Sequence, residues 1–138
     1  MTEGNIFFRP SRVYRHKKKC GLMDKIQIKD LLLRCIIGTN DFERKDKQDV
    51  LINIILFLDF HEAADKDDVL KTANYREITK KIIEMVEGSR FYLLETLAEK
   101  ISQICLEHPK VAKVQVAVEK PGALRFARSV GVEIVREK

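Results

Sequence analysis

Two amphipathic segments that follow one another almost without a linker constrain the fold of this chain most. The first, Tyr75–Glu87, has apolar residues at spacings of three and four, with Asn74 as a candidate cap and Gly88 as a stop. The second opens at Ser89, a candidate N-cap, and closes before Pro109. Its apolar stripe consists of Leu94, Leu97, Ala98, Ile101, Ile104 and Cys105. Because so little chain separates them, we expect two antiparallel helices.

Segments with the apolar pattern of strands flank these helices on both sides. Residues 25–37 and 50–60 precede them, joined by a polar loop of about ten residues. Alternating valines at residues 111–118 mark a third strand, and residues 130–135 mark the last. We expect residues 61–70, which are acidic, to form an irregular connection. The order strand–strand–helix–helix–strand–strand predicts an α+β fold, a four-stranded antiparallel sheet with both helices on one face.

Positive charge is concentrated at the start of the chain. Residues 1–22 carry six of the 26 Lys and Arg but one of the 21 Asp and Glu, so residues 23–138 carry equal numbers of each sign. We therefore expect a basic, disordered leader before a domain at 23–138, with Met23 as a candidate natural start. A nucleic-acid interface needs basic residues on a folded face, so nucleic acid is not an expected partner. No apolar run approaches the ~18 residues that span a bilayer, and we predict a cytoplasmic protein without membrane contact.

The three cysteines and three histidines are widely dispersed. Cys20, Cys35 and Cys105 are odd in number and lack metal-ligand spacing. We expect reduced thiols, with Cys105 in the core, and no metal site.

Four polar residues lie near the ends of predicted elements. Glu43 is in the first loop, Tyr75 begins the first helix, Glu95 follows the start of the second, and Lys120 ends the third strand. Singly, each has an ordinary explanation as a loop charge, a half-buried packing residue, a solvated helix residue or an exposed strand terminator. The sequence contains no glycine-rich phosphate loop, nucleophile elbow or zinc signature.

In combination, these residues give the chain a resemblance to the dihydroneopterin aldolase family, from Met23 to Lys138. The motifs that carry it are Ile37-Gly38 followed by Glu43, Gln48-Asp49-Val50, Asn74-Tyr75, Leu93-Leu94-Glu95-Thr96-Leu97-Ala98-Glu99 and Glu119-Lys120-Pro121-Gly122-Ala123. None is specific alone, but five in the same order on matching elements are. The resemblance implies the tunnelling fold, with subunits joined edge to edge into a tetrameric ring, two rings usually stacked as an octamer, and sites between neighbouring subunits.

The resemblance also implies a reaction and a binding pocket. Family members cleave 7,8-dihydroneopterin by a retro-aldol step of folate biosynthesis, releasing 6-hydroxymethyl-7,8-dihydropterin and glycolaldehyde. By this resemblance Glu95 binds the pterin's N–H donors, since one carboxylate accepts two parallel N–H bonds. The backbone around Leu94, and that of Ala73 and Asn74 from a neighbouring subunit, completes the pocket.

Three residues carry the catalytic roles that the resemblance implies. Lys120 organises proton transfer through water from the substrate's side-chain hydroxyl, Glu43 assists near that hydroxyl, and Tyr75 acts from the neighbouring subunit. The pterin ring near N5 supplies the electron sink, so neither a Schiff base on Lys120 nor a metal or other cofactor is required. We therefore predict a metal-independent, homo-octameric aldolase.

A sister family, dihydroneopterin triphosphate 2′-epimerase, is the main alternative. The chain resembles it in Gln48–Asn53, Tyr75-Arg76 and Ala123–Ala127. Arg125 and Arg128 would either meet a triphosphate or serve as rim or structural charges, and we favour the second role.

Other segments favour the aldolase over its alternatives. The turn at residues 120–123 and the segment 131–134 resemble aldolases more than epimerases. A non-catalytic ring-forming scaffold would leave the combination of Glu95, Tyr75 and Lys120 unexplained. A nucleic-acid-binding module would need residues 1–22 for salt-dependent binding.

Overall fold

The structure, a computed structural model, describes residues 23–138, so the predicted leader lies outside the described residues. The elements in chain order are β2 (Asp24–Cys35), η3 (Asp41–Arg44), β3 (Gln48–Leu58), α1 (His61–Lys66), η4 (Val69–Lys71), α2 (Tyr75–Glu87), α3 (Leu94–Glu107), β4 (Lys113–Pro121) and β5 (Ser129–Glu137).

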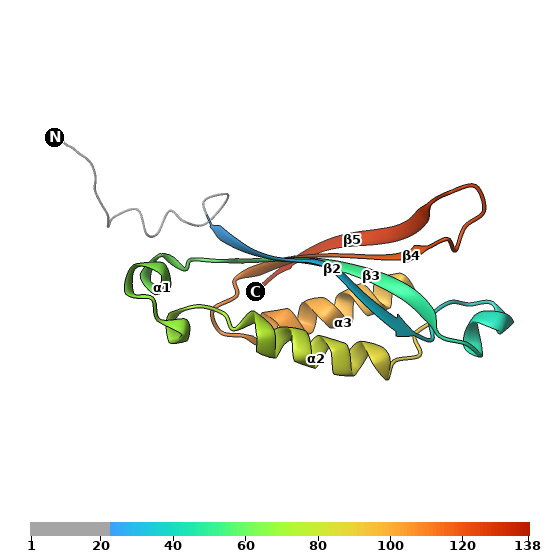
Figure 1. Cartoon of the computed structure of the whole chain (residues 1–138), viewed down its shortest axis with the longest axis horizontal. Coiled ribbons are helices and arrows are strands. Elements are labelled where there is room, and N and C mark those ends of the chain that lie inside the picture. The colour runs from blue at the N-terminus through green and yellow to red at the C-terminus, as the bar shows by residue number, and fades with distance from the viewer. Residues whose placement is uncertain (1–22) are drawn as a thin grey trace.

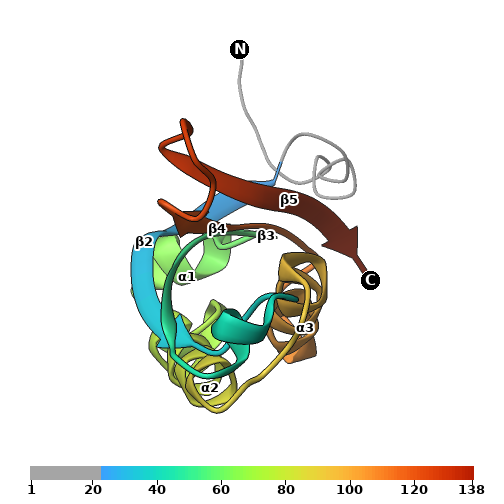
Figure 2. The ribbon, with the colours of Figure 1, turned by 90° about the vertical axis from the view of Figure 1, so that its right-hand side faces the viewer.

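The four strands form one antiparallel sheet in the order β2-β3-β4-β5. Figures 1 and 2 show α2 and α3 side by side on one face of this sheet, where α2 contacts β2, and α3 contacts β4 and β5. The predicted α+β fold and its order of elements are confirmed. Of the helices in residues 23–138, none has the length and apolar character that crossing a membrane requires.

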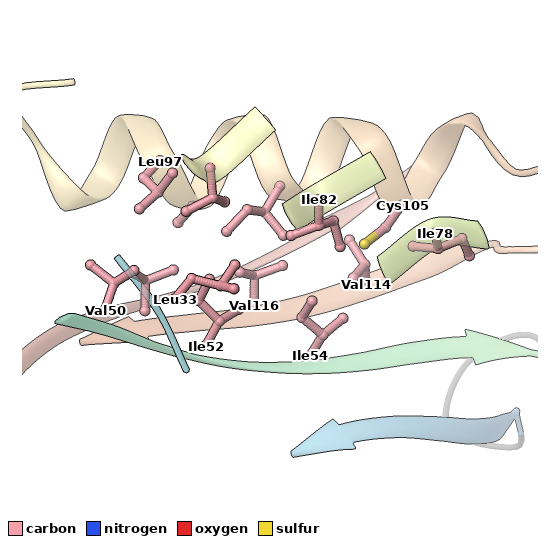
Figure 3. Packing of buried hydrophobic residues seen from close by; sticks show 14 of the residues in the cluster. Leu33, Val50, Ile52, Ile54, Ile78, Ile82, Leu97, Cys105, Val114 and Val116 are labelled. Atoms are coloured by element: carbon pink, nitrogen blue, oxygen red, sulfur yellow. The ribbon is translucent and has the colours of Figure 1, made fainter. Parts of the chain in front are cut away.

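The core lies between the sheet and the two helices, because alternate residues of each strand point to that face. Figure 3 shows strand residues such as Ile52, Ile54 and Val116 meeting Ile82 and Leu97 from the helices. Cys105 is buried among them as a free thiol, as predicted, and burial raises its pKa to about 12. Truncating a fully buried residue such as Ile52 to Ala costs about 2–5 kcal/mol of stability.

Helix α2 has the predicted bounds and cap. The Asn74 side chain accepts hydrogen bonds from the backbone N–H groups of Arg76 and Glu77, which satisfies two of the first-turn donors. Gly88 follows the last residue of the helix as its C-cap. The buried face of α2 holds Ile78, Ile82 and Val86, at the spacing that the sequence predicted.

The second helix starts later than predicted. It begins at Leu94, and Ser89 instead donates its hydroxyl to the Val86 carbonyl at the end of α2. Residues 89–93 connect the helices without forming helix or strand, and Phe91 among them packs partly against the core. The predicted N-cap is therefore wrong, because the hydroxyl satisfies a carbonyl of the preceding helix.

Other predicted boundaries also need correction. The first strand ends at Cys35, ahead of Gly38, and the second begins at Gln48 and ends at Leu58. Residues 61–70 are not wholly irregular, since they contain α1 and most of η4. Ala63 is the buried residue of α1, so that helix has no apolar stripe by which the sequence could reveal it.

A β-bulge interrupts β2. Its pairing with β3 shifts by one residue between Ile28 and Leu31, and Asp30 has a positive φ of 56°. The Asp30 backbone N–H donates to the Asn53 side-chain oxygen at 2.8 Å. Asn53, a polar residue inside an apolar strand, therefore satisfies the backbone donor that the bulge releases from regular pairing.

Candidate active site

An ion pair between one buried and one partly buried side chain joins two residues that are 77 positions apart in the chain. Lys120 Nζ donates to Glu43 Oε2 at 2.8 Å, and the two side chains are 12% and 8% exposed. Of the four candidate polar residues, the structure brings these two together. A buried carboxylate and a partly buried ammonium group at this distance can hold and relay a proton.

Regular strand geometry places Lys120. Val114, Val116 and Val118 are buried on the helix-covered face of β4, and Lys120 is the next residue of the same parity. The short helix η3 lies in the connection between β2 and β3, and it carries Glu43 as its buried residue. The two side chains therefore meet where this connection passes the end of β4.

Two further donors hold the Glu43 carboxylate. The Asn40 backbone N–H donates to Oε1 at 3.1 Å, and Gln48 Nε2 donates to Oε2 at 3.2 Å. Gln48 also donates to the Ile37 carbonyl at 2.6 Å, which fixes its amide. Gln48 is thus a further residue of the candidate site. It belongs to the family motif Gln48-Asp49-Val50, but its position at the start of a strand gave no indication that it contacts Glu43.

These donors favour the ionised form of Glu43. The Lys120 hydrogen bond, against the opposing effect of burial and with help from Asn40 and Gln48, lowers the pKa of Glu43 from 4.5 to about 2. Glu43 is therefore a carboxylate throughout the neutral range. It can orient a proton donor or accept a proton, but it does not carry one at rest.

Gly38 makes room for this carboxylate. Its φ is +127°, a conformation that L side chains rarely adopt, and a Cβ there would overlap the carboxyl group of Glu43. Gly38, which directly follows the first predicted strand at residues 25–37, is therefore needed to accommodate the Glu43 carboxylate.

The predicted binding residues on α3 lie at its first turn. Leu94 is buried and Glu95 is exposed, and the N-cap residue Leu93 offers no side-chain acceptor to the first-turn N–H groups. These groups are left for water or a ligand. Figure 1 shows that α3 starts at the same end of the sheet as η3 and the β4–β5 turn, so Leu94 and Glu95 lie at the end that holds the ion pair.

The other predicted residues lie at the opposite end. Ala73 is buried, Asn74 caps α2, and Tyr75 is its 55% exposed first residue. Figure 1 shows that α2 begins at the end of the sheet away from η3. The 13 residues of α2 span about 20 Å at 1.5 Å per residue, so a single chain does not bring Tyr75 to Lys120.

No group of three His, Cys, Asp or Glu side chains within residues 23–138 is arranged to hold a metal ion.

Arg125 and Arg128, which the sequence left as anion contacts or rim charges, lie in or beside the β4–β5 turn. Arg128 is 3.5 Å from Glu119 in an exposed ion pair, and the Arg125 guanidinium lies over the Phe126 ring.

The order of elements, the one-sided helix pair and the sheet topology are those of a tunnelling-fold protein. The crystal structure of Escherichia coli dihydroneopterin aldolase in complex with neopterin superposes on this chain with a TM-score of 0.79 at 34% identity, covering 83% of this chain and 99% of that one. The sequence model of the dihydroneopterin aldolase family matches residues 26–135. This chain belongs to the dihydroneopterin aldolase family.

The similar proteins include both dihydroneopterin triphosphate 2′-epimerases and dihydroneopterin aldolases. The chain is 44% identical over 112 residues to dihydroneopterin triphosphate 2′-epimerase of Pseudomonas aeruginosa, covering 81% of this chain and 91% of that protein. It is 42% identical over 101 residues to dihydroneopterin aldolase of Streptomyces coelicolor, covering 73% and 85%. The predicted family and its sister are both confirmed as relatives, and the chain is an enzyme of this family.

Proposed function

We propose that this chain cleaves 7,8-dihydroneopterin by a retro-aldol reaction to 6-hydroxymethyl-7,8-dihydropterin and glycolaldehyde. The observation that carries the proposal is the buried Glu43–Lys120 pair at the end of the sheet where α3 begins. A non-catalytic scaffold would not account for Glu43, Lys120 and the start of α3 with Glu95 lying at the same end of the sheet.

The pterin ring would bind at the first turn of α3. The Glu95 carboxylate is exposed there and accepts from two adjacent N–H groups of the ring. Backbone N–H groups near Leu94 are available to a ring oxygen. This arrangement directs the substrate's side chain toward Lys120.

The proposed reaction needs one base, one proton donor and an electron sink. The proton of the 2′-hydroxyl leaves through water ordered by Lys120 and Glu43, and the C1′–C2′ bond breaks. C2′ departs as the aldehyde carbon of glycolaldehyde, and the bond's electrons enter the C6–N5 imine of the ring. Protonation at C1′ restores that imine and gives the hydroxymethyl product. Lys120 acts as an aligned ammonium group, so no Schiff base, metal or other cofactor enters the scheme.

A second copy of the chain would complete the site. Ala73, Asn74 and Tyr75 lie about 20 Å from the ion pair's end of the sheet, so in our proposal they act in a neighbouring subunit's site. Within residues 23–138, β2 and β5 are the outer strands of the sheet and offer backbone for joining subunits into a ring, which we propose to be a tetramer that stacks as an octamer. Cytoplasmic location stays a prediction.

Product analysis tests this proposal. Purified protein is given 7,8-dihydroneopterin and its triphosphate side by side, in chelator. We expect glycolaldehyde from the unphosphorylated substrate and a loss of about 10²–10⁴-fold in kcat for Lys120→Ala. Lys100→Ala, an exposed lysine of α3, is the matched control and should keep full activity. No product from either substrate by a folded protein would contradict the proposal.

Epimerisation of the triphosphate is the second candidate, favoured by the 44% identity to the Pseudomonas aeruginosa epimerase. The same site would cleave and rejoin the C1′–C2′ bond after the aldehyde turns over. The contacts of Arg128 with Glu119 and of Arg125 with Phe126 support rim roles for both arginines. Conversion mainly of the triphosphate to its 2′-epimer would establish this alternative.

A further inference from the structure

The guanidinium of Arg44 connects two distant parts of the backbone. It donates to the carbonyl oxygens of Gly38 at 3.0 Å, Phe91 at 3.0 Å and Arg90 at 2.6 Å. Its central carbon lies 4.0 Å from the centre of the Tyr92 ring. Arg44 is partly buried and uses its planar fork of donors for three main-chain acceptors and its face for an aromatic ring.

The two parts that Arg44 joins belong to the two halves of the proposed site. Gly38 lies against the Glu43 carboxylate, and Arg44 directly follows Glu43 in η3. Residues 90–92 lead into Leu94 and Glu95, the first turn of α3. The Gly38 backbone N–H also donates to the Phe91 carbonyl, at 3.4 Å, so the two segments run next to each other where Arg44 clamps them.

We propose that Arg44 is a positioning residue that sets the distance between the ring-binding carboxylate, Glu95, and the Glu43–Lys120 pair. This inference rests on the proposed function, because it assigns Glu95 to substrate binding. Residues 89–93 form neither helix nor strand, so the fork of Arg44 supplies order that secondary structure does not. The ion pair has its own supports in Asn40 and Gln48, so losing Arg44 displaces Glu95 more than it disturbs Lys120.

The inference predicts a particular kinetic pattern. Arg44→Ala weakens neopterin binding and raises KM by about tenfold or more, since loss of even one hydrogen bond between the charged Glu95 carboxylate and the ring has an effect of this size. It lowers kcat less, and the pH dependence of kcat stays unchanged because the ion pair remains. Arg44→Lys does not rescue binding, since one ammonium group cannot reach three carbonyls.

Arg34→Ala is the matched control. Arg34 bonds the Lys47 carbonyl and the Asp49 carboxylate, but it touches neither Gly38 nor residues 90–92. Neopterin affinity is measured by calorimetry well below the melting temperature of every variant, and circular dichroism checks that each is folded. Arg44→Lys keeps the charge and the aliphatic stem, and it carries the test if Arg44→Ala does not fold.

A double-mutant cycle gives the decisive result. If Arg44 acts by placing Glu95, then in a Glu95→Gln background Arg44→Ala changes kcat/KM by less than about twofold. Additive effects of the two substitutions, or wild-type affinity in Arg44→Ala, would overturn the inference while leaving the proposed function intact. A wild-type protein that neither binds neopterin nor cleaves 7,8-dihydroneopterin would overturn both.

Discussion

The Glu43–Lys120 pair makes the stability of this protein depend on pH in a way that one substitution should remove. A carboxyl whose pKa falls from 4.5 to about 2 on folding adds about 3 kcal/mol to the free energy of unfolding at neutral pH. Because the folded-state pKa is the lower one, this contribution is fully present above the unfolded pKa of 4.5. It is lost as the pH falls toward 2.

Glu43→Gln keeps the size of the side chain and an oxygen acceptor for Lys120, but it cannot titrate. We expect the free energy of unfolding to fall by about 3 kcal/mol less in this variant than in the wild type between pH 5.5 and pH 2. Urea denaturation at a fixed protein concentration, repeated across this range, measures the difference. Fixed concentration matters because, in the proposed oligomer, subunit association would contribute to the apparent stability.

Asp49→Asn is the control for this experiment. Asp49 pairs with Arg34 at 2.9 Å, but both side chains are about half exposed or more, and exposed pairs contribute about 0–1 kcal/mol. Its pH dependence should therefore stay close to that of the wild type. If Glu43→Gln and wild type lost stability in parallel as the pH fell, the Glu43–Lys120 pair would not be the source of the pH dependence, contrary to this prediction.

Further predictions concern other parts of the site and the fold. Gly38→Ala should cost about 1–3 kcal/mol from backbone strain and should reduce kcat as far as Glu43→Gln does, because the new methyl displaces the carboxylate; unchanged kcat would contradict this. Asn74→Ala should lower stability by about 1 kcal/mol in denaturation experiments, with no effect on the ion pair at the far end of α2. Tyr75→Ala and Lys120→Ala should each inactivate the enzyme. Refolding the two variants together in equal amounts should restore about a quarter of the activity, because about a quarter of the shared sites would then contain both the wild-type Tyr75 and the wild-type Lys120. A mixture as inactive as its parents would show that Tyr75 is not supplied by a neighbour.

The periodic parts of the fold could be predicted from the sequence, because burial on one face imposes a repeat that is visible in single residues. The alternating valines of β4 and the spacing of Ile78, Ile82 and Val86 on α2 are examples. The start of α3 could not, because Ser89 has the chemistry of a cap for either of two adjacent helices. Six residues of α1 with one buried alanine gave no pattern at all.

The candidate site could be predicted where a residue lies in a motif and not where its role depends on distant contacts. Glu43 and Lys120 were candidates because of the family resemblance. Their contact joins residues 77 positions apart, which no local sequence pattern encodes. Gln48 and Arg44 were missed, since their partners are main-chain carbonyls and a carboxylate brought close only by folding. A polar residue that begins a strand or ends a short helix looks like a solvated one until its acceptors are known.

The bulge at Asp30 has a consequence for how copies of this chain fit together. A bulge adds local twist and bend to its strand, and here it sits in β2, which among residues 23–138 pairs with β3 alone. In the ring that we propose, the sheets of neighbouring subunits join edge to edge into one closed sheet, and the curvature of each sheet determines how many subunits close the ring. In the proposed ring, the Asp30–Asn53 hydrogen bond would therefore influence the number of subunits as well as the stability of a single chain. Deleting the extra residue would straighten the sheet and favour a wider ring with more subunits.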